Sequence, residues 1–189
     1  VQQVEAMKEM VNAFSEYARA PRFEMTELNL NQLVAELTDL YRAQVSGRGV
    51  TLDLQLDPAL AGVVADRGRL RQLLHNLLTN SVEALEGRHG GRISIATRRV
   101  AIADDEVAEL AVEDNGPGFQ RELMGQVFDP YVTTKARGTG LGLAIVRKIV
   151  EEHGGHVEAE NRSDGGARVR VELPLNGVTR GEVARREPH

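Results

Sequence analysis

The sequence predicts an α+β domain in which a mixed sheet carries helices on one face. Apolar residues recur at helical spacing in three internal segments and alternate at strand spacing in several others. These segments follow the order helix, strands, helix, hairpin, helix, hairpin, whereas a doubly wound fold would alternate strand and helix regularly. At 189 residues the chain holds one large domain, or one domain with an appendage.

Residues 1–18 form the first predicted helix, which precedes this domain. Apolar residues recur in it at helical spacing, and Pro21 follows its end, because the residue before a proline avoids helical angles. A helix this short cannot bury an apolar face alone, so it packs either on a partner helix, which we favour, or on the main domain. The chain starts without Met and within the helical pattern, which indicates a piece of a longer protein.

The main domain begins near Phe23. A capping box at residues 29–32 starts a helix that runs through about Val45, and Gly47 and Gly49 end it. The side chains expected to point inward from this helix are those of Leu33, Leu37, Leu40 and Tyr41.

Two strands and a second helix follow. Apolar and polar residues alternate throughout residues 50–56, which predicts a strand with one buried face. Residues 63–65 are expected to add a short edge strand. Residues 66–85 are strongly helical, and their apolar side chains cover most of the circumference, as in a largely buried helix. The gap is a polar stripe made of Gln72, Asn76, Asn80 and Glu83. The stripe is either a solvated edge or a surface that faces a partner or ligand.

The second half of the domain holds two hairpins separated by a helix. Residues 93–97 start the first hairpin, whose second strand ends at Asp114. A helix over about residues 141–152 comes next, followed by a hairpin over residues 156–173 and a flexible tail over residues 176–189.

Bulk properties exclude several classes of protein. No apolar run approaches the roughly 20 residues that a membrane-spanning helix needs, and the N-terminus lacks a signal-peptide core. The net charge of −5 argues against a nucleic-acid partner. The absence of cysteine excludes disulfides, thiolate metal sites and cysteine nucleophiles, and it fits a reducing cytosol.

A glycine run at residues 138–142 opens directly into the third internal helix. It is no P-loop, because Leu143 follows where lysine would be required, and no dinucleotide fingerprint, because residues 130–137 are no strand. Glycines do let backbone amides approach phosphates, and a helix N-terminus favours negative charge. Side chains near enough to add a hydroxyl or positive charge are Thr139, Lys135 and Arg137. The alternative is an ordinary flexible helix start.

Two further features fit a nucleotide. Asp114, at a strand end, can accept a hydrogen bond from an amine such as that of adenine, while Gly116 and Gly118 leave room for a flat ring; the alternative is an Asx-turn that shapes the bend. Asn80 offers an amide oxygen suited to Mg²⁺, and Asn76, one turn earlier, can orient a water or the shell of the metal. Together the features predict a nucleotide site.

At these residues the chain resembles the ATP-binding catalytic domain of sensor histidine kinases. Four segments are similar to the N, G1, F and G2 boxes of that family, namely residues 76–80, 114–118, 128–131 and 138–142. Gly165 and Gly166 resemble its last glycine element, and the resemblance covers about residues 23–175. Residues 11–19 and 130–135 are similar to the nitrogen-regulation (NtrY/NtrB-like) group.

The resemblance implies a Bergerat ATP-binding fold, a two-layer α/β sandwich with a lid over about residues 119–137. By motif position, Asp114 binds the adenine amine, Asn80 holds Mg²⁺ and Asn76 supports the metal. The residues implied to contact ATP or ADP are Asn76, Asn80, Asp114, Gly116, Gly118, Phe128, Lys135, Gly138, Thr139, Gly140, Leu141 and Gly142. Those implied to assist transfer are Asn76, Lys135 and Arg137.

The implied activity is that of a protein-histidine kinase, which passes the γ-phosphoryl group of ATP to a histidine on a separate helical-hairpin domain. The phosphoryl group then goes to the receiver domain of a response regulator. Residues 1–20 become the end of the dimerising hairpin, residues 23–175 the catalytic domain and residues 176–189 the tail. The full-length protein is expected to be a homodimer, with this chain the cytoplasmic portion of a sensor, membrane-anchored or not.

The chain departs from that family in two respects. No phosphoacceptor motif is present, so the chain alone is not expected to phosphorylate itself. Glu83 occupies a position where many members carry a basic residue, and Lys135 or Arg137 is expected to supply the missing charge. The alternatives are an ATPase of the same GHKL superfamily, in which a glutamate at the Asn76 position activates water, and a module that senses nucleotide without phosphorylating histidine.

Overall fold

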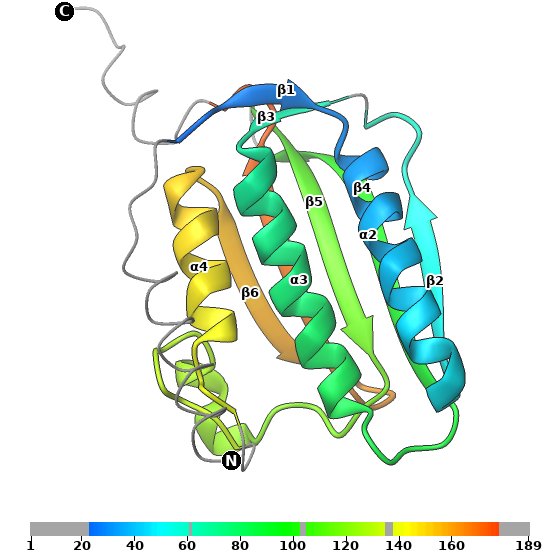
Figure 1. Ribbon diagram of the computed structural model, residues 1–189. Coiled ribbons are helices and arrows are strands. Elements are labelled where there is room, and N and C mark those ends of the chain that lie inside the picture. The colour runs from blue at the N-terminus through cyan, green and yellow to red at the C-terminus, as the bar shows by residue number, and fades with distance from the viewer. Residues whose placement is uncertain (1–22, 61, 103–104, 135–137, 178–189) are drawn as a thin grey trace, which may run out of the picture.

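The computed structural model describes residues 23–60, 62–102, 105–134 and 138–177, and its centre is a five-stranded mixed sheet in the order β2-β4-β5-β7-β6. The strands are β2 (Val50–Leu56), β4 (Gly91–Ile102), β5 (Asp105–Asp114), β6 (His156–Asn161) and β7 (Ala167–Pro174). β2 and β4 are parallel, and the other neighbours are antiparallel. Helices cover one face of this sheet (Figure 1), namely α2 (Leu30–Val45), α3 (Arg67–Ala84) and α4 (Gly142–Glu152).

This arrangement confirms the predicted α+β class with a mixed sheet and helices on one face. The predicted N-terminal helix over residues 1–18 and the tail from residue 178 lie outside the described residues. β4 is longer than the predicted strand, because its second half, in which apolar alternation is lost, still pairs with β5 from Arg98 opposite Glu109 to Ile102 opposite Asp105.

A second sheet of two short strands lies at one end of the domain. β1 (Thr26–Leu28) and β3 (Val63–Ala65) pair antiparallel, and the amide of Val64 donates to the carbonyl of Leu175 at 3.0 Å. The sequence predicted β3 but not β1. A three-residue strand with one buried side chain is too short for alternation to reveal it.

α2 begins at its predicted cap and packs against α3. The amide of Gln32 donates to Asn29 Oδ1 at 3.0 Å, whereas the Gln32 side chain bonds Glu36, so half of the predicted capping box forms. The prediction that Leu40 points inward is wrong, because its side chain is 63% exposed. Successive helical residues are turned by about 100°, and Tyr41, which reaches α3, takes the inward position.

α3 supplies much of the core. Its buried apolar side chains are Leu70, Leu73, Leu74, Leu77, Leu78 and Val82. They form one core cluster with inward-facing side chains of the sheet and with Leu141, Ile145 and Ile149, which lie in α4 or directly before it. These last three side chains are buried, as expected. The polar strip of Gln72, Asn76, Asn80 and Glu83 lies between these apolar side chains, so the packing of α3 decides which way the strip faces.

The N-terminal end of α3 joins three segments. Asp66 caps the helix, with its Oδ1 accepting from the amide of Arg69 at 3.0 Å and its Oδ2 accepting from the amide of Glu24 at 3.0 Å. The Asp66 amide donates to Nε2 of the buried His153, whose Nδ1 lies 2.7 Å from the carbonyl oxygen of Ile149. Because an amide only donates, Nδ1 carries the ring proton, and burial lowers the pKa of His153.

We predict that Asp66→Ala lowers the free energy of unfolding by about 1–2 kcal/mol, because it removes an N-cap and leaves the Glu24 amide without its acceptor. Burial alone would raise the pKa of Asp66, but the amide donors outweigh burial and lower it. The ionised cap therefore stabilises the fold above the unfolded-state pKa of about 4, and this contribution is lost as the pH falls through the lowered folded-state pKa.

Urea unfolding followed by circular dichroism between about pH 7 and pH 3 measures both effects, in the range where the cap titrates. Asp39→Ala is the matched control, since Asp39 is exposed in the middle of α2 and, among the described residues, pairs with Arg42 of the same helix. Equal losses in the two variants would contradict the capping role.

Candidate functional site

A cavity of about 520 Å³ lies where β5 ends and α4 begins. Figure 1 shows these two ends toward the bottom of the domain. It is bounded by α3, the end of β5, the segment after β5 and the glycine run before α4. That segment contains the 3₁₀ helix η2 (Arg121–Gln126). A cavity of this size suits a small-molecule ligand.

The polar stripe of α3 forms one wall of the cavity. Asn76, Asn80 and Glu83 line it, whereas Gln72 does not. A Cβ added at Gly142 would lie 3.4 Å from Asn80 Nδ2 and 3.7 Å from Asn76 Oδ1, so both amide groups adjoin the start of α4. Most of the stripe therefore faces the cavity, as its ligand-facing interpretation predicted.

Beside that stripe lies a hydrogen-bonded group that sequence reasoning missed. The Tyr41 hydroxyl of α2 lies 2.6 Å from Nδ1 of His75 and 2.8 Å from the hydroxyl of Thr79, and both of these α3 residues line the cavity. No local pattern marks this contact, because Tyr41 and His75 are 34 residues apart. The contact ties the cavity wall to α2.

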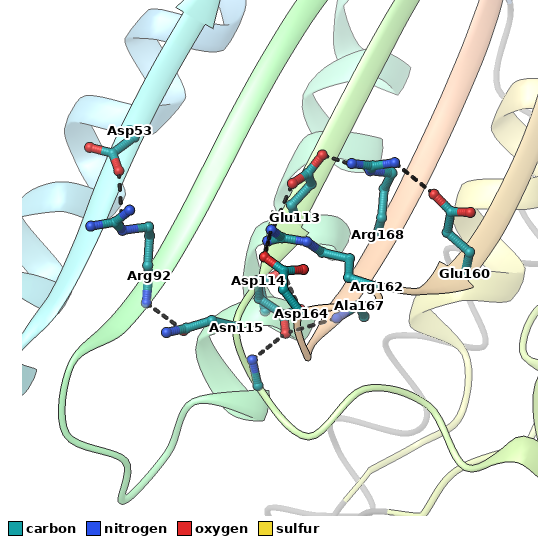
Figure 2. Close-up of polar contacts among 12 residues, drawn as sticks. Asp53, Arg92, Glu113, Asp114, Asn115, Glu160, Arg162, Asp164, Ala167 and Arg168 are labelled. Atoms are coloured by element: carbon teal, nitrogen blue, oxygen red, sulfur yellow. Dashed lines mark hydrogen bonds and ion pairs between the residues drawn. The ribbon is translucent and has the colours of Figure 1, made fainter.

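Asp114 lies on the floor of the cavity and is 5% exposed. Its Oδ1 accepts from the amide of Gly116 at 2.8 Å and from that of Ala167 at 3.4 Å, and its Oδ2 accepts from the Ser81 hydroxyl at 3.4 Å. Figure 2 shows the carboxylate between its neighbours. Burial raises the pKa of Asp114, while the amide donors oppose that rise.

Both interpretations of Asp114 are compatible with this geometry. The bond from Gly116 to Oδ1 is the Asx-turn that shapes the bend. Among the described residues, Oδ2 accepts one long hydrogen bond, from Ser81, so it retains capacity to accept from a donor in the cavity. A buried carboxylate that presents one oxygen to a cavity is suited to an amine or amide N–H.

The turn between β6 and β7 is pressed against this floor. A Cβ added at Gly166 would lie 1.9 Å from the Asp114 carbonyl oxygen, and Gly166 has a φ of 92°. The Asn161 side chain accepts from the amide of Phe119 at 2.6 Å and donates to the Phe119 carbonyl at 2.8 Å. The hairpin thus holds both Asp114 and the start of the segment that follows β5.

The outer face of the sheet next to Asp114 carries ion pairs, drawn in Figure 2. Arg168 bonds Glu113 at 2.6 Å and Glu160 at 2.8 Å, and Arg162 lies 3.3 Å from Glu113. These pairs cross β5, β7 and the β6–β7 hairpin. Partly exposed pairs of this kind contribute little stability individually, but they align the strands that carry Asp114.

The glycine run is held by the segment on the other side of the cavity. The amide of Tyr131 donates to the Gly140 carbonyl at 2.9 Å, and a Cβ at Gly140 would come within 2.5 Å of the Tyr131 carbonyl carbon. Gly140 and Tyr131 both have positive φ, 66° and 68°. Leu141 is buried, and its amide donates to the Thr139 hydroxyl at 3.3 Å. These contacts position the glycine run at the start of α4.

The candidate residues from the sequence fall into three groups. Those that line the cavity are Asn76, Asn80, Asp114, Gly118, Gly138, Thr139, Gly140, Leu141 and Gly142. Gly116 bonds Asp114 without lining the cavity, and Phe128 packs partly buried against the core. Lys135 and Arg137 lie outside the described residues. Lining residues that the sequence did not indicate include Ser81, Ala167, Thr133 and Thr134.

Sequence comparison relates the chain to ATPases and sensor kinases. The profile described as histidine kinase-, DNA gyrase B-, and HSP90-like ATPase matches residues 65–177. The sensor histidine kinase ZraS of Klebsiella oxytoca is 34% identical over 180 residues, which are 95% of this chain and 38% of ZraS. The nitrogen regulation protein NtrY of Azorhizobium caulinodans is 37% identical over 183 residues, which are 94% of this chain and 23% of NtrY. The chain thus spans well under half of these relatives.

Solved structures give the same relationship. The catalytic domain of the histidine kinase ThkA matches with a TM-score of 0.72 and 35% identity, covering 82% of this chain and 97% of that domain. The histidine kinase ThkA, solved in complex with the response regulator protein TrrA, matches with a TM-score of 0.77 and 30% identity, covering 93% of this chain and 49% of that one. Within the part of this chain that the structure describes, no helix is both long and apolar enough to cross a bilayer.

We predict that Gly166→Ala costs about 3–5 kcal/mol of unfolding free energy, because the added methyl group combines backbone strain with an overlap against the Asp114 carbonyl. Gly165→Ala is the control. Gly165 has a similar φ of 96° but open space around its Cβ position, so only strain, about 1–2 kcal/mol, is expected. Chemical denaturation of both variants measures the difference, and equal losses would show that the contact with Asp114 carries no energy.

Proposed function

This chain belongs to the histidine kinase-, DNA gyrase B- and HSP90-like ATPase family, as a histidine kinase catalytic domain, and we propose that it binds Mg-ATP and donates the γ-phosphoryl group to a histidine of the whole protein. One observation carries the proposal. A single cavity joins the buried Asp114 carboxylate, the Asn76 and Asn80 amides and the glycine run over residues 138–142.

Each wall of the cavity is assigned a part of the nucleotide. Asp114 accepts a hydrogen bond from the adenine amine, for which its Oδ2 has capacity. The backbone amides of residues 138–142, at the start of α4, donate to phosphate oxygens, since a helix N-terminus attracts anions. Gly118 also lines the cavity. In this proposal, Lys135 and Arg137 supply positive charge to the phosphates. Gly116 donates a hydrogen bond to Asp114, and Phe128 packs against the core next to the site.

The donor set on α3 fits Mg²⁺. The ion prefers oxygen ligands and keeps several waters while it shares phosphate oxygens with the protein. Asn80 offers an amide oxygen beside the start of α4, and Asn76 lies within the same region. Asn80 holds the ion in this proposal, and Asn76 orients its shell. When bound, the ion neutralises phosphate charge.

The residues suit transfer better than hydrolysis. Phosphoryl transfer depends on positioning and charge neutralisation, and it needs no strong base within this cavity. An amide such as that of Asn76 cannot take a proton from water, so the residue favours the kinase over an ATPase that would activate water at this position.

The remaining assignments concern the whole protein. Residues 1–20 form the end of a helical hairpin through which the protein dimerises. The acceptor histidine lies on this hairpin, outside the present chain. Residues 23–175 form the catalytic domain, and residues 176–189 form a tail. A response regulator receives the phosphoryl group, which is supported by the solved complex of ThkA with TrrA. The chain works in the cytoplasm, as the catalytic part of a dimeric sensor.

We predict that Asp114→Ala weakens ADP binding by about 10–100-fold or more, because a charged hydrogen-bond acceptor is lost from a buried site. Asn80→Ala should weaken binding in MgCl₂ while leaving affinity in EDTA nearly unchanged. Isothermal titration calorimetry measures both variants. Asp53→Ala, which removes an exposed carboxylate on β2, is the control. Unchanged ADP affinity in a folded Asp114→Ala protein would refute the adenine assignment.

A second prediction concerns self-labelling. Incubated with γ-labelled ATP, this chain should acquire no acid-labile phosphate, whereas the full-length protein should. His75 contacts Tyr41 and His153 is buried, while His89 and His156 are followed by Gly90 and Val157 rather than by an acidic residue. Acid-labile label on this chain alone would place an acceptor within it and contradict the proposal that the acceptor lies elsewhere.

A further inference from the structure

The cavity carries more negative than positive charge where it is described. Two carboxylates line it, those of Glu83 and Asp114, and among the described lining residues there is no lysine or arginine. Asp114 is buried on the floor, but Glu83 is exposed to solvent at the wall formed by α3. A polyphosphate that enters this cavity therefore meets a carboxylate of its own sign.

Helical geometry places Glu83 with the amides that adjoin the start of α4. At about 100° per residue, Glu83 lies about 20° around α3 from Asn76 and about 60° from Asn80. Ser81, which bonds Asp114, lies about 160° from Glu83 on the same scale. Glu83 thus points from α3 in nearly the same direction as the two asparagines and away from Ser81.

A second observation agrees with that direction. The Tyr41 hydroxyl contacts Thr79, one turn before Glu83. Burial raises the pKa of Tyr41, and the negative charge of Glu83 raises it further, so the two groups lie within electrostatic reach. The Glu83 charge therefore reaches the Tyr41 hydroxyl, which contacts His75 and Thr79 in the cavity wall.

We propose that Glu83 determines which form of the nucleotide the cavity accepts, favouring the divalent-metal complex over the metal-free anion. The inference rests on the proposed nucleotide function. A carboxylate repels bare phosphate, yet it attracts a divalent cation, which commonly binds through one or two carboxylates together with phosphate oxygens and water. Beside Asn80, Glu83 adds a second hard oxygen group on the cation side of the nucleotide.

The experiment compares ADP and ATP affinities of the 189-residue chain in MgCl₂ and in EDTA, by calorimetry at one ionic strength. Glu83→Gln should strengthen metal-free binding and weaken binding with Mg²⁺, so that the ratio of the two affinities falls on the order of tenfold. Glu83→Lys should lower the ratio further. Glu86→Gln removes a nearby exposed charge that does not line the cavity, and it should leave the ratio as in the wild type.

The possible results separate this inference from the proposed function. If Glu83→Gln keeps the wild-type ratio of affinities in MgCl₂ and EDTA, or if Glu86→Gln changes that ratio equally, the role of Glu83 is overturned. The proposal that the chain binds nucleotide then still stands. A wild-type chain that binds neither nucleotide in either buffer overturns the proposed function, and the inference falls with it. Circular dichroism of each variant confirms that the affinities compare folded proteins.

Discussion

The buried carboxylate of Asp114 is the constraint on which the site depends. A carboxylate that is 5% exposed is costly unless it is hydrogen-bonded, and its donors come from three places in the chain: the loop after β5, the start of β7 and α3. Satisfying one side chain therefore fixes the relative positions of a strand end, a hairpin and a helix. The close approach of Gly166 to the Asp114 backbone is part of the same arrangement.

α3 links this floor to the rest of the domain. Its leucines fill the core, so the helix cannot rotate without exposing apolar surface. Its remaining polar strip is thereby held toward the cavity, where Asn76 and Asn80 meet the start of α4. The packing of the core and the direction of the functional side chains are two consequences of the same helix orientation.

Much of the fold followed from local patterns. Alternation over residues 50–56, helical spacing over residues 66–85 and the glycine-bounded helix before residue 154 all matched the observed elements. Patterns failed where the deciding contact is distant. β1 is too short to alternate and exists because β3 pairs with it. Leu40 and Tyr41 both looked like core residues, and the contacts with α3 show that Tyr41 alone is buried.

The sequence by itself determined the order of elements, the class of fold and the residue types of a nucleotide site, because periodicity and motif spacing are local properties. Only the tertiary structure decided which polar groups share one cavity. It placed Glu83 with the asparagines, Ser81 with Asp114, and Phe128 against the core instead of the cavity. These placements depend on how helices and strands pack across long sequence separations, since a side chain's neighbours in space are set by the whole core.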